Sequence, residues 1–222
     1  MTPAARTRAA VAVDIALCTV RDGALHVLLG QTQSGPFTGW WTLPGGLVRG
    51  DETLDAAAAR ELSAQTGVRD VYLEQLYTFG HPARDPQGRV VSVAYVGLVP
   101  PERFVDARAG DKYAQVAWRP VADLPALAYD HASVVATAVE RLRGKVAYTN
   151  LVYALLPPAF TLGELQAMYE AVLGRTLDRR NFRKKLLSLG LLKPLGRTRR
   201  GAHRPAALYG FRRRRPMVVE IL

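Results

Sequence analysis

The stretch from residue 45 to residue 68, GGLVRGDETLDAAAARELSAQTGV, constrains the fold more than any other part of the chain. Two glycines precede a segment in which apolar residues recur at helical spacing from Leu54, and Gly67 ends that segment. Asp51 or Thr53 can cap the predicted helix. Glycines before a helix let the backbone approach a ligand closely, and a helix N-terminus favours anions. The stretch therefore predicts a helix beside an anion-binding loop.

Arg60, Glu61, Ala64 and Gln65 share one face of this predicted helix, because residues three and four apart are neighbours on a helix surface. A site for diphosphate chemistry needs acidic groups clustered at such a point, since magnesium prefers several oxygen ligands. Only one of the four is a carboxylate. The pattern indicates the position of an active site but lacks the acidic cluster that its chemistry requires.

The stretch resembles the Nudix box, which reads G, five residues, E, seven residues, R-E-hydrophobic, one residue, E-E, one residue, G-hydrophobic. The matching residues are Gly46, Glu52, Arg60, Glu61, Leu62, Gly67 and Val68. In the family the E-E pair supplies metal ligands, and here Ala64 and Gln65 replace it. The resemblance implies a Nudix fold with no catalytic residues, no bound metal and no hydrolase activity. The alternative is a weakly active hydrolase of ADP-ribose or nucleoside diphosphate derivatives that depends on Glu52 and Glu61.

The rest of the first two thirds predicts a mixture of strands and helices. Strands are expected at 11–20 and 24–31 around an Asp-Gly turn, and then at 40–43, 70–79, 89–99 and 113–118, with a helix from about 130 to 145. This mixture indicates an α/β (α+β) sandwich over residues 1–146. The single cysteine, Cys18, lies in an apolar run and is expected to be a packed core thiol.

The net charge of +11 is confined to the last third of the chain. Residues 1–149 hold 15 Lys and Arg against 15 Asp and Glu, whereas residues 150–222 hold 15 against 4. Such asymmetry indicates a second domain, over 147–222, that faces a polyanion. No apolar run approaches the roughly 20 residues needed to span a bilayer. We therefore expect a cytoplasmic protein without a membrane segment.

A second resemblance extends over almost the whole chain. The segments QLYTFGHPARDPQGRVVSVAYVGLV, YDH at 129–131 and RLRGKVAY at 141–148 are similar to the Nudix-related transcriptional regulators called NrtR. In that family the Nudix domain senses a nucleotide, commonly ADP-ribose, and the attached domain binds operators of NAD biosynthesis genes. The resemblance implies a dimeric repressor that needs no cofactor and takes ADP-ribose or a related nucleotide as its effector.

Several side chains are expected to line the effector pocket, because loops at sheet ends gather functional groups and Arg suits phosphate. The loop between the strands at 70–79 and 89–99 could instead be a solvated turn. Arg60 and Glu61 could instead form an ion pair that only holds the loop and the helix together. Trp40 and Phe79 either stack on adenine or belong to the core, and His131 is expected to be structural. The full set of predicted ligand residues is Arg49, Glu52, Arg60, Glu61, Phe79, His81, Arg84 and Arg89, with Asp85 beside them in the loop.

The basic third of the chain predicts a winged helix-turn-helix. Thr161 and Glu164 stand in capping-box relation before one amphipathic helix that Gly174 ends. A second helix, capped by Thr176 or Asp178, is expected to bury Phe182, Leu186, Leu187 and Leu189. Two strands around an Arg-rich loop then form a wing.

In a winged helix the second helix enters the major groove and the loop reaches phosphate or the minor groove. Asn181 is expected to read adenine and one of the arginines near it guanine. The predicted contacts with double-stranded operator DNA are Arg179, Arg180, Asn181, Arg183, Lys184, Arg197, Arg199, Arg200 and Arg204. The alternative is a basic face on a dimerisation or RNA-binding module. The tail PMVVEIL is apolar enough to pack against another surface, such as a dimer partner.

The preferred hypothesis is a repressor in which ADP-ribose alters the spacing of two winged helices and weakens operator binding. A third possibility is a sugar-catabolism regulator with the same two domains. The sequence does not identify the operator or the regulated genes.

Overall fold

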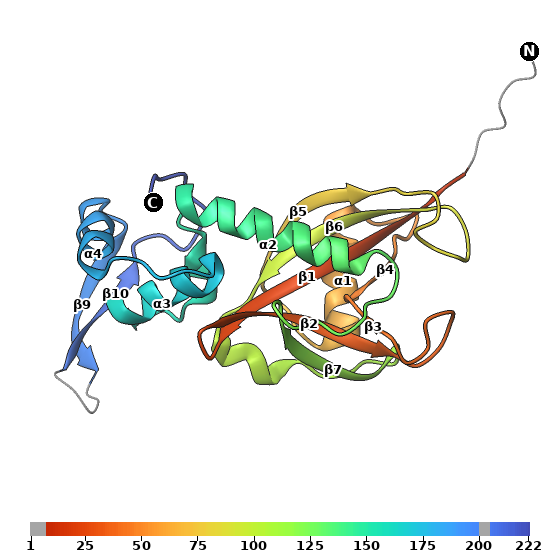
Figure 1. Cartoon of the computed structure of the whole chain (residues 1–222), viewed down its shortest axis with the longest axis horizontal. Helices are drawn as coiled ribbons and strands as arrows, with labels where there is room; N and C mark the ends of the chain where they lie inside the picture. The colour runs from red at the N-terminus through yellow and green to blue at the C-terminus, as the bar shows by residue number, and fades with distance from the viewer. Residues whose placement is uncertain (1–7, 200–204) are drawn as a thin grey trace, which may run out of the picture.

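The computed structural model describes residues 8–199 and 205–222, which form a sandwich and a smaller C-terminal unit joined by one long helix (Figure 1). The strands of the sandwich are β1 (Ala10–Arg21), β2 (Ala24–Thr32), β3 (Trp41–Thr42), β4 (Gly45–Leu47), β5 (Tyr72–Phe79), β6 (Val90–Leu98) and β7 (Tyr113–Pro120). Their order is β3-β2-β1-β6-β5, with β4 paired to β1 and β7 paired to β2. Strands β1 and β6 are parallel, and the other pairs are antiparallel. The sheet is therefore mixed.

Strand β1 is buried on both faces, and its side chains alternate between two cores. Ile15 and Leu17 pack with Leu62 of helix α1 (Leu54–Thr66) in one core. On the opposite face, Cys18 packs with Val135 of helix α2 (His131–Tyr148) in the other core. The predicted α/β sandwich is thus confirmed, and Cys18 is a buried free thiol whose pKa burial raises to about 12.

Helix α1 begins and ends where the sequence predicts. The Thr53 hydroxyl accepts a hydrogen bond from the backbone N–H of Ala56 at 3.2 Å, and Gly67 ends the helix with a left-handed φ of 73°. The predicted strand at 40–43 is shorter in the structure and covers only Trp41 and Thr42. The reason is that the Leu43 N–H donates to His131 Nδ1 at 2.9 Å, so it does not extend the strand ladder.

The C-terminal unit follows the 3₁₀ segment η2 (Leu151–Leu155) and contains two helices and a small sheet. Its elements are β8 (Phe160–Thr161), α3 (Leu162–Leu173), α4 (Arg179–Ser188), β9 (Leu192–Arg199) and β10 (Ala206–Phe211). The sandwich contains a 3₁₀ segment of its own, η1 (Pro101–Asp106), between β6 and β7. Thr161 and Glu164 form the predicted capping box at the start of α3. The order β8-β10-β9 completes a winged helix with a three-stranded antiparallel sheet.

Helix α4 packs on α3 through Phe182 and Leu186, which are both buried. The prediction that Leu187 is buried is wrong, because this side chain is 48% exposed. Leu187 is adjacent to Leu186 and is therefore turned about 100° away from it around the helix axis. The face that packs is the row formed by Phe182, Leu186 and the half-buried Leu189.

One hydrophobic core runs without interruption from the sandwich into the winged helix. Val146 at the end of α2, Leu155 of η2 and Leu165 of α3 belong to the same buried cluster as Cys18 of β1. The apolar tail packs on the end of α2 of its own chain, where Ile221 is buried and its N–H donates to the Ala147 carbonyl at 2.8 Å. Within the described residues, no helix combines the length and apolar character needed to cross a membrane.

Candidate functional site

A cavity of about 460 Å³ lies where β1, β4 and the N-terminus of α2 meet the loop between β5 and β6. We call it the polar cavity, because its lining includes six Asp, Arg, Lys and His side chains: Asp14, Arg84, Asp85, Arg89, Lys112 and His131. Its volume falls in the range of small-ligand sites, which is roughly 300–1,000 Å³. The cavity is thus large enough to hold a nucleotide-sized group.

A second cavity of about 610 Å³ adjoins the first and is called the aromatic cavity. Its lining includes the rings of Phe37, Trp40, Phe79 and Tyr129, together with His81. Phe37, Arg84 and Tyr129 line both cavities. The Phe37 and Tyr129 ring centroids are 4.4 Å apart, so an aromatic pair stands where the two cavities meet.

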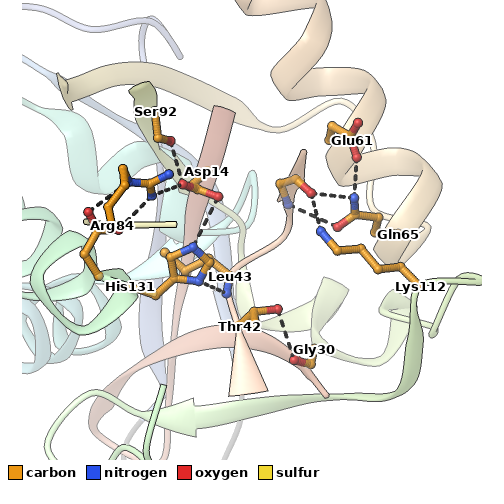
Figure 2. A network of polar contacts seen from close by, with 12 residues as sticks. Asp14, Gly30, Thr42, Leu43, Glu61, Gln65, Arg84, Ser92, Lys112 and His131 are labelled. Carbon is orange, nitrogen blue, oxygen red and sulfur yellow. Dashed lines mark hydrogen bonds and ion pairs between the residues drawn. The ribbon is translucent and has the colours of Figure 1, made fainter. Parts of the chain in front are cut away.

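The polar cavity contains a buried ionic network centred on Asp14 of β1, shown in Figure 2. The Asp14 carboxylate accepts hydrogen bonds from Ser92 Oγ at 2.5 Å and from Arg84 Nη2 at 3.0 Å. His131 Nε2 lies 3.3 Å from the other Asp14 oxygen. Burial raises the pKa of Asp14, but the contacts with His131, Ser92 and Arg84 together lower it by more. The pKa of Asp14 therefore lies below its ordinary value. Asp14 is therefore a fixed negative charge at neutral pH.

Arg84 and His131 connect this network to the start of helix α2. Arg84 donates to both carboxylate oxygens of Asp130, at 3.0 and 2.7 Å, in addition to its bond with Asp14. Because the Leu43 N–H donates to His131 Nδ1, that nitrogen carries no proton, and the Nε2–H faces Asp14. Two carboxylates thus neutralise the buried guanidinium of Arg84.

Gln65 occupies the other side of the site, on helix α1 (Figure 2). Its amide oxygen accepts from the Gly45 N–H at 3.1 Å and from the Tyr113 hydroxyl at 2.8 Å. Its amide nitrogen donates to the Gly45 carbonyl at 2.7 Å and to Glu61 Oε2. The Gln65 side chain therefore both accepts hydrogen bonds through its oxygen and donates them through its nitrogen. An ionised carboxylate at this position could only accept.

Lys112, in the loop immediately before β7, donates from Nζ to the same Gly45 carbonyl at 2.5 Å. Burial of the ammonium group lowers the pKa of Lys112, while the charges of Asp14 and Glu61 act in the opposite direction. No carboxylate lies within ion-pair distance of Lys112 among the residues that the structure describes. This ammonium group thus brings a cation to the floor of the polar cavity.

Glu52, Arg60 and Glu61 form an ion-pair cluster between helix α1 and the loop before it. Arg60 donates to Glu52 through Nε at 2.8 Å and to Glu61 through Nη1 at 2.5 Å. The hydrogen bond from Arg60 lowers the pKa of Glu52 to about 2 and raises that of Arg60 above its ordinary value. A Cβ on Gly46 would lie 2.6 Å from the Glu61 carboxylate, so any larger residue there would displace this carboxylate. The geometry favours the structural interpretation of Arg60 and Glu61.

The donor set around Gly45 does not suit a divalent cation. The Gly45 carbonyl and Glu61 Oε2 both accept from nitrogen donors, whereas magnesium needs oxygen lone pairs directed at it. Among the described residues, no group of three or more His, Cys, Asp and Glu side chains could hold a metal ion. Gln65 stands at a metal-ligand position of the Nudix box, and the Lys112 ammonium group shares the Gly45 carbonyl with it.

The structure brings four of the eight predicted ligand residues to the two cavities. Arg84 and Arg89 line the polar cavity, Arg84 also lines the aromatic cavity, and Phe79 and His81 line the aromatic cavity alone. The other four predicted residues, Arg49, Glu52, Arg60 and Glu61, are absent from both linings. Arg49 is exposed, and its backbone N–H donates to Glu52 at 2.9 Å.

Sequence reasoning missed Asp14 and Lys112, and assigned His131 only a structural part. Asp14 lies within an apolar strand and Lys112 within a short loop, so neither has a local pattern that signals a site. A usable signal did exist for His131, because YDH at 129–131 is one of the segments that carry the family resemblance. All three residues of that segment line one or both cavities.

The predicted DNA-contacting residues of helix α4 cluster at its N-terminus, where Asp178 caps the helix. Arg179, Arg180, Asn181 and Lys184 are exposed. Arg183 is half-buried instead, with an Nε atom that is buried and has no hydrogen-bond partner in the structure described. Burial, followed by the charge of Arg179, lowers the pKa of Arg183. The helix start therefore presents three of its four basic residues to solvent.

The wing places further arginines on the same unit. Arg197 is exposed, and Arg199 at the end of β9 pairs with Glu164 of α3 and donates to the Ala159 carbonyl at 3.3 Å. Arg200 and Arg204 lie outside the described residues. In the run at 212–215, Arg214 donates to the carbonyls of Tyr153 and Leu156 at 2.7 and 2.6 Å and so contributes to the junction between the two units.

Comparison with known proteins gives two family matches. Residues 9–140 match the NUDIX domain, and residues 152–211 match the NrtR DNA-binding winged helix domain. The chain is 36% identical over 201 residues to the ADPR responsive transcriptional repressor NtrR of Acinetobacter baylyi, across 90% of this chain and 80% of the relative.

Solved structures agree with these matches. The chain is similar to Shewanella oneidensis NrtR in complex with a 27mer DNA, with a TM-score of 0.80 and 36% identity over 91% of this chain and 93% of that one. It is also similar to the NUDIX domain of the same protein in complex with ADP ribose, with a TM-score of 0.57 and 36% identity over 64% of this chain and 94% of that one.

Proposed function

Because the chain belongs to the NrtR family, in which a Nudix domain precedes a winged-helix domain, we propose that it is a transcriptional repressor that responds to ADP-ribose. Residues 1–146 act as the sensor and residues 147–222 as the DNA-binding domain. The observation that carries the proposal is the side chain of Gln65. It binds Gly45 and Glu61 where the Nudix box has a metal ligand, and so leaves a ligand cavity without the acidic cluster that hydrolysis needs.

The two adjoining cavities fit the two chemically different ends of ADP-ribose. An adenine ring stacks in the aromatic cavity, where Phe79, Trp40 and Tyr129 offer ring faces and His81 a polar edge. The diphosphate lies in the polar cavity beside Arg84 and Arg89. The complex of the Shewanella NUDIX domain with ADP ribose supports this choice of effector.

Operator DNA binds the winged helix. Helix α4 enters the major groove with Asn181 and one of Arg179 and Arg180 at base edges, while Lys184 contacts phosphate. Arg197 and Arg199, with Arg200 and Arg204 beyond them, contact the backbone from the wing. Arg183 supports the helix from its half-buried position. A homodimer presents two such helices to half-sites about 34 Å apart, which is one turn of DNA.

The regulated genes are those of NAD biosynthesis, and ADP-ribose releases the repressor from them. Allostery requires that the ligand bind one dimer geometry more tightly than the other, so ADP-ribose must favour the geometry that no longer matches the half-sites. The protein carries out no hydrolysis.

The test is a titration of fluorescent DNA from upstream of the protein's own gene, followed by anisotropy with and without ADP-ribose. We expect the operator Kd to rise by at least about fivefold at saturating ligand. Ribose 5-phosphate, which lacks adenine, serves as the matched control and should leave the Kd unchanged. An unchanged Kd in millimolar ADP-ribose, or tighter binding, contradicts the proposal. An effect of ribose 5-phosphate alone would indicate a sugar-responsive regulator.

A second test addresses hydrolysis. Incubation with ADP-ribose and magnesium or manganese should yield no AMP or ribose 5-phosphate above the blank. The double variant Ala64→Glu/Gln65→Glu restores both carboxylates of the box, and turnover in this variant would identify their loss as the cause. Turnover by the unmodified protein would instead support the hydrolase alternative.

A further inference from the structure

The Gly45 carbonyl is the point where two protein nitrogen atoms converge. Gln65 Nε2 donates to it at 2.7 Å from helix α1, and Lys112 Nζ donates to it at 2.5 Å from the loop before β7 (Figure 2). The Gly45 N–H is bound by Gln65 Oε1 at 3.1 Å, so this peptide is held from both ends. A carbonyl that accepts two such bonds has no lone pair left for a metal ion.

The loop that carries Lys112 is fixed against the end of helix α1. The Arg108 N–H donates to the Thr66 carbonyl at 2.8 Å, and the Gly110 N–H donates to the Gln65 carbonyl at 2.9 Å. A Cβ on Gly110 would lie 2.3 Å from the Ala64 carbonyl oxygen, so only glycine permits this approach. The backbone thus holds Lys112 in register with Gln65, and the position of its ammonium group is a built feature of the fold.

The charges around the polar cavity leave Lys112 free to serve a ligand. Arg84 is neutralised by Asp14 and Asp130. Among the described residues Lys112 has no ion-pair partner, and its hydrogen bond to the Gly45 carbonyl uses one of the three donors of an ammonium group. A bound diphosphate would therefore meet a compact positive charge in the lining of the cavity.

We propose that the Lys112 ammonium group takes the place of the divalent cation and binds the diphosphate of the nucleotide effector, so that effector binding requires no metal. This inference rests on the proposed function, because the ligand is the same ADP-ribose. Lys112 contributes the charge, and Gln65 fixes the carbonyl that orients it. Arg89, held by the Gly80 carbonyl at 2.9 Å, faces the diphosphate from the opposite loop.

The experiment is calorimetric titration of the full chain with ADP-ribose, once in EDTA and once in magnesium. Unmodified protein should bind equally well in both. Lys112→Met should weaken binding at least about tenfold, as expected for the loss of a hydrogen bond from a charged group. Lys193→Met, an exposed lysine of the wing, is the matched control and should bind as the unmodified protein does. Lys112→Arg keeps the charge and should recover part of the affinity.

Adenosine, which lacks the diphosphate, separates a charge effect from a loss of folding. It should bind the unmodified protein and Lys112→Met alike. Binding of ADP-ribose only when magnesium is present overturns the inference, and so does full affinity in Lys112→Met. Absence of ADP-ribose binding in both buffers overturns the proposed function itself, which distinguishes the two failures.

Discussion

The change Asp14→Asn should destabilise the sensor domain, because it removes one of the two carboxylates that neutralise the buried Arg84. Asp14 is 6% exposed and Arg84 is 7% exposed, and their contact is 3.0 Å long. Breaking a buried ion pair costs roughly 3–5 kcal/mol. Asp130 still contacts Arg84, so we expect the lower end, about 3 kcal/mol. For a chain of this size, this corresponds to a fall in melting temperature of about 6–12 °C.

Circular dichroism during thermal unfolding at neutral pH measures the effect. Asp22→Asn is the matched control, because Asp22 is exposed in the β1–β2 turn and Asn tolerates its positive φ of 50°. The control should melt within about 2 °C of the unmodified protein. A similarly small change in Asp14→Asn would refute the reasoning, since it would mean that Asp130 alone neutralises Arg84.

The same network gives the stability a defined pH dependence. The pKa of Asp14 is lower in the folded protein than in the unfolded chain, where it is about 3.9. Its contribution is therefore fully present above about pH 4 and is lost as the pH falls through the depressed folded value. The difference in unfolding free energy between the unmodified protein and Asp14→Asn should stay constant near neutral pH and shrink in acid, as urea titrations at several pH values will show.

Four further substitutions test other parts of the molecule. Leu186→Ala should lower the free energy of unfolding by about 2–5 kcal/mol, whereas Leu187→Ala, which is 48% exposed, should change it by less than about 1 kcal/mol in the same urea titration. Gly46→Ala places a Cβ 2.6 Å from the Glu61 carboxylate and should cost about 1–3 kcal/mol, measured by thermal unfolding. Arg197→Ala should reduce the slope of log Kobs against log salt for operator binding by about 0.9, and an unchanged slope would argue against a phosphate contact.

The features that sequence predicted well are those set by neighbouring residues. Thr53 and Asp178 cap helices because a short polar side chain reaches a backbone N–H three residues ahead. Gly67 and Gly174 end helices because they adopt a left-handed φ without strain. Most of the order of strands and helices followed from such signals, but the short strands β4 and β8 were not predicted.

The ionic network could not be predicted from local patterns, because its members come from distant parts of the chain. Asp14 lies in an apolar strand and meets Arg84, which is 70 residues away, only when β1 and the loop after β5 come together. Lys112 contacts Gly45 across 67 residues in the same way. The prediction that Leu187 is buried was wrong for a different reason. The apolar character of a residue alone does not show whether it lies on the packed face of a helix or beside it. Sequence could therefore locate the Nudix helix and the arginines of the loop, but not Asp14 and Lys112, which face them.

Helix α2 connects the cavities with the winged helix, so it is the element through which the proposed effector would influence the proposed operator binding. One end of this helix meets the Asp14 network through Asp130 and His131, and its other end packs with the winged helix (Figure 1). Eighteen residues span about 27 Å, so the helix bridges the two units by itself. In the proposed complex a diphosphate beside Arg84 would compete with Asp130 for the same guanidinium and so disturb one of the contacts that hold the start of the helix. If ADP-ribose weakens operator binding as proposed, the operator must weaken ADP-ribose binding by the same factor, because coupling is reciprocal.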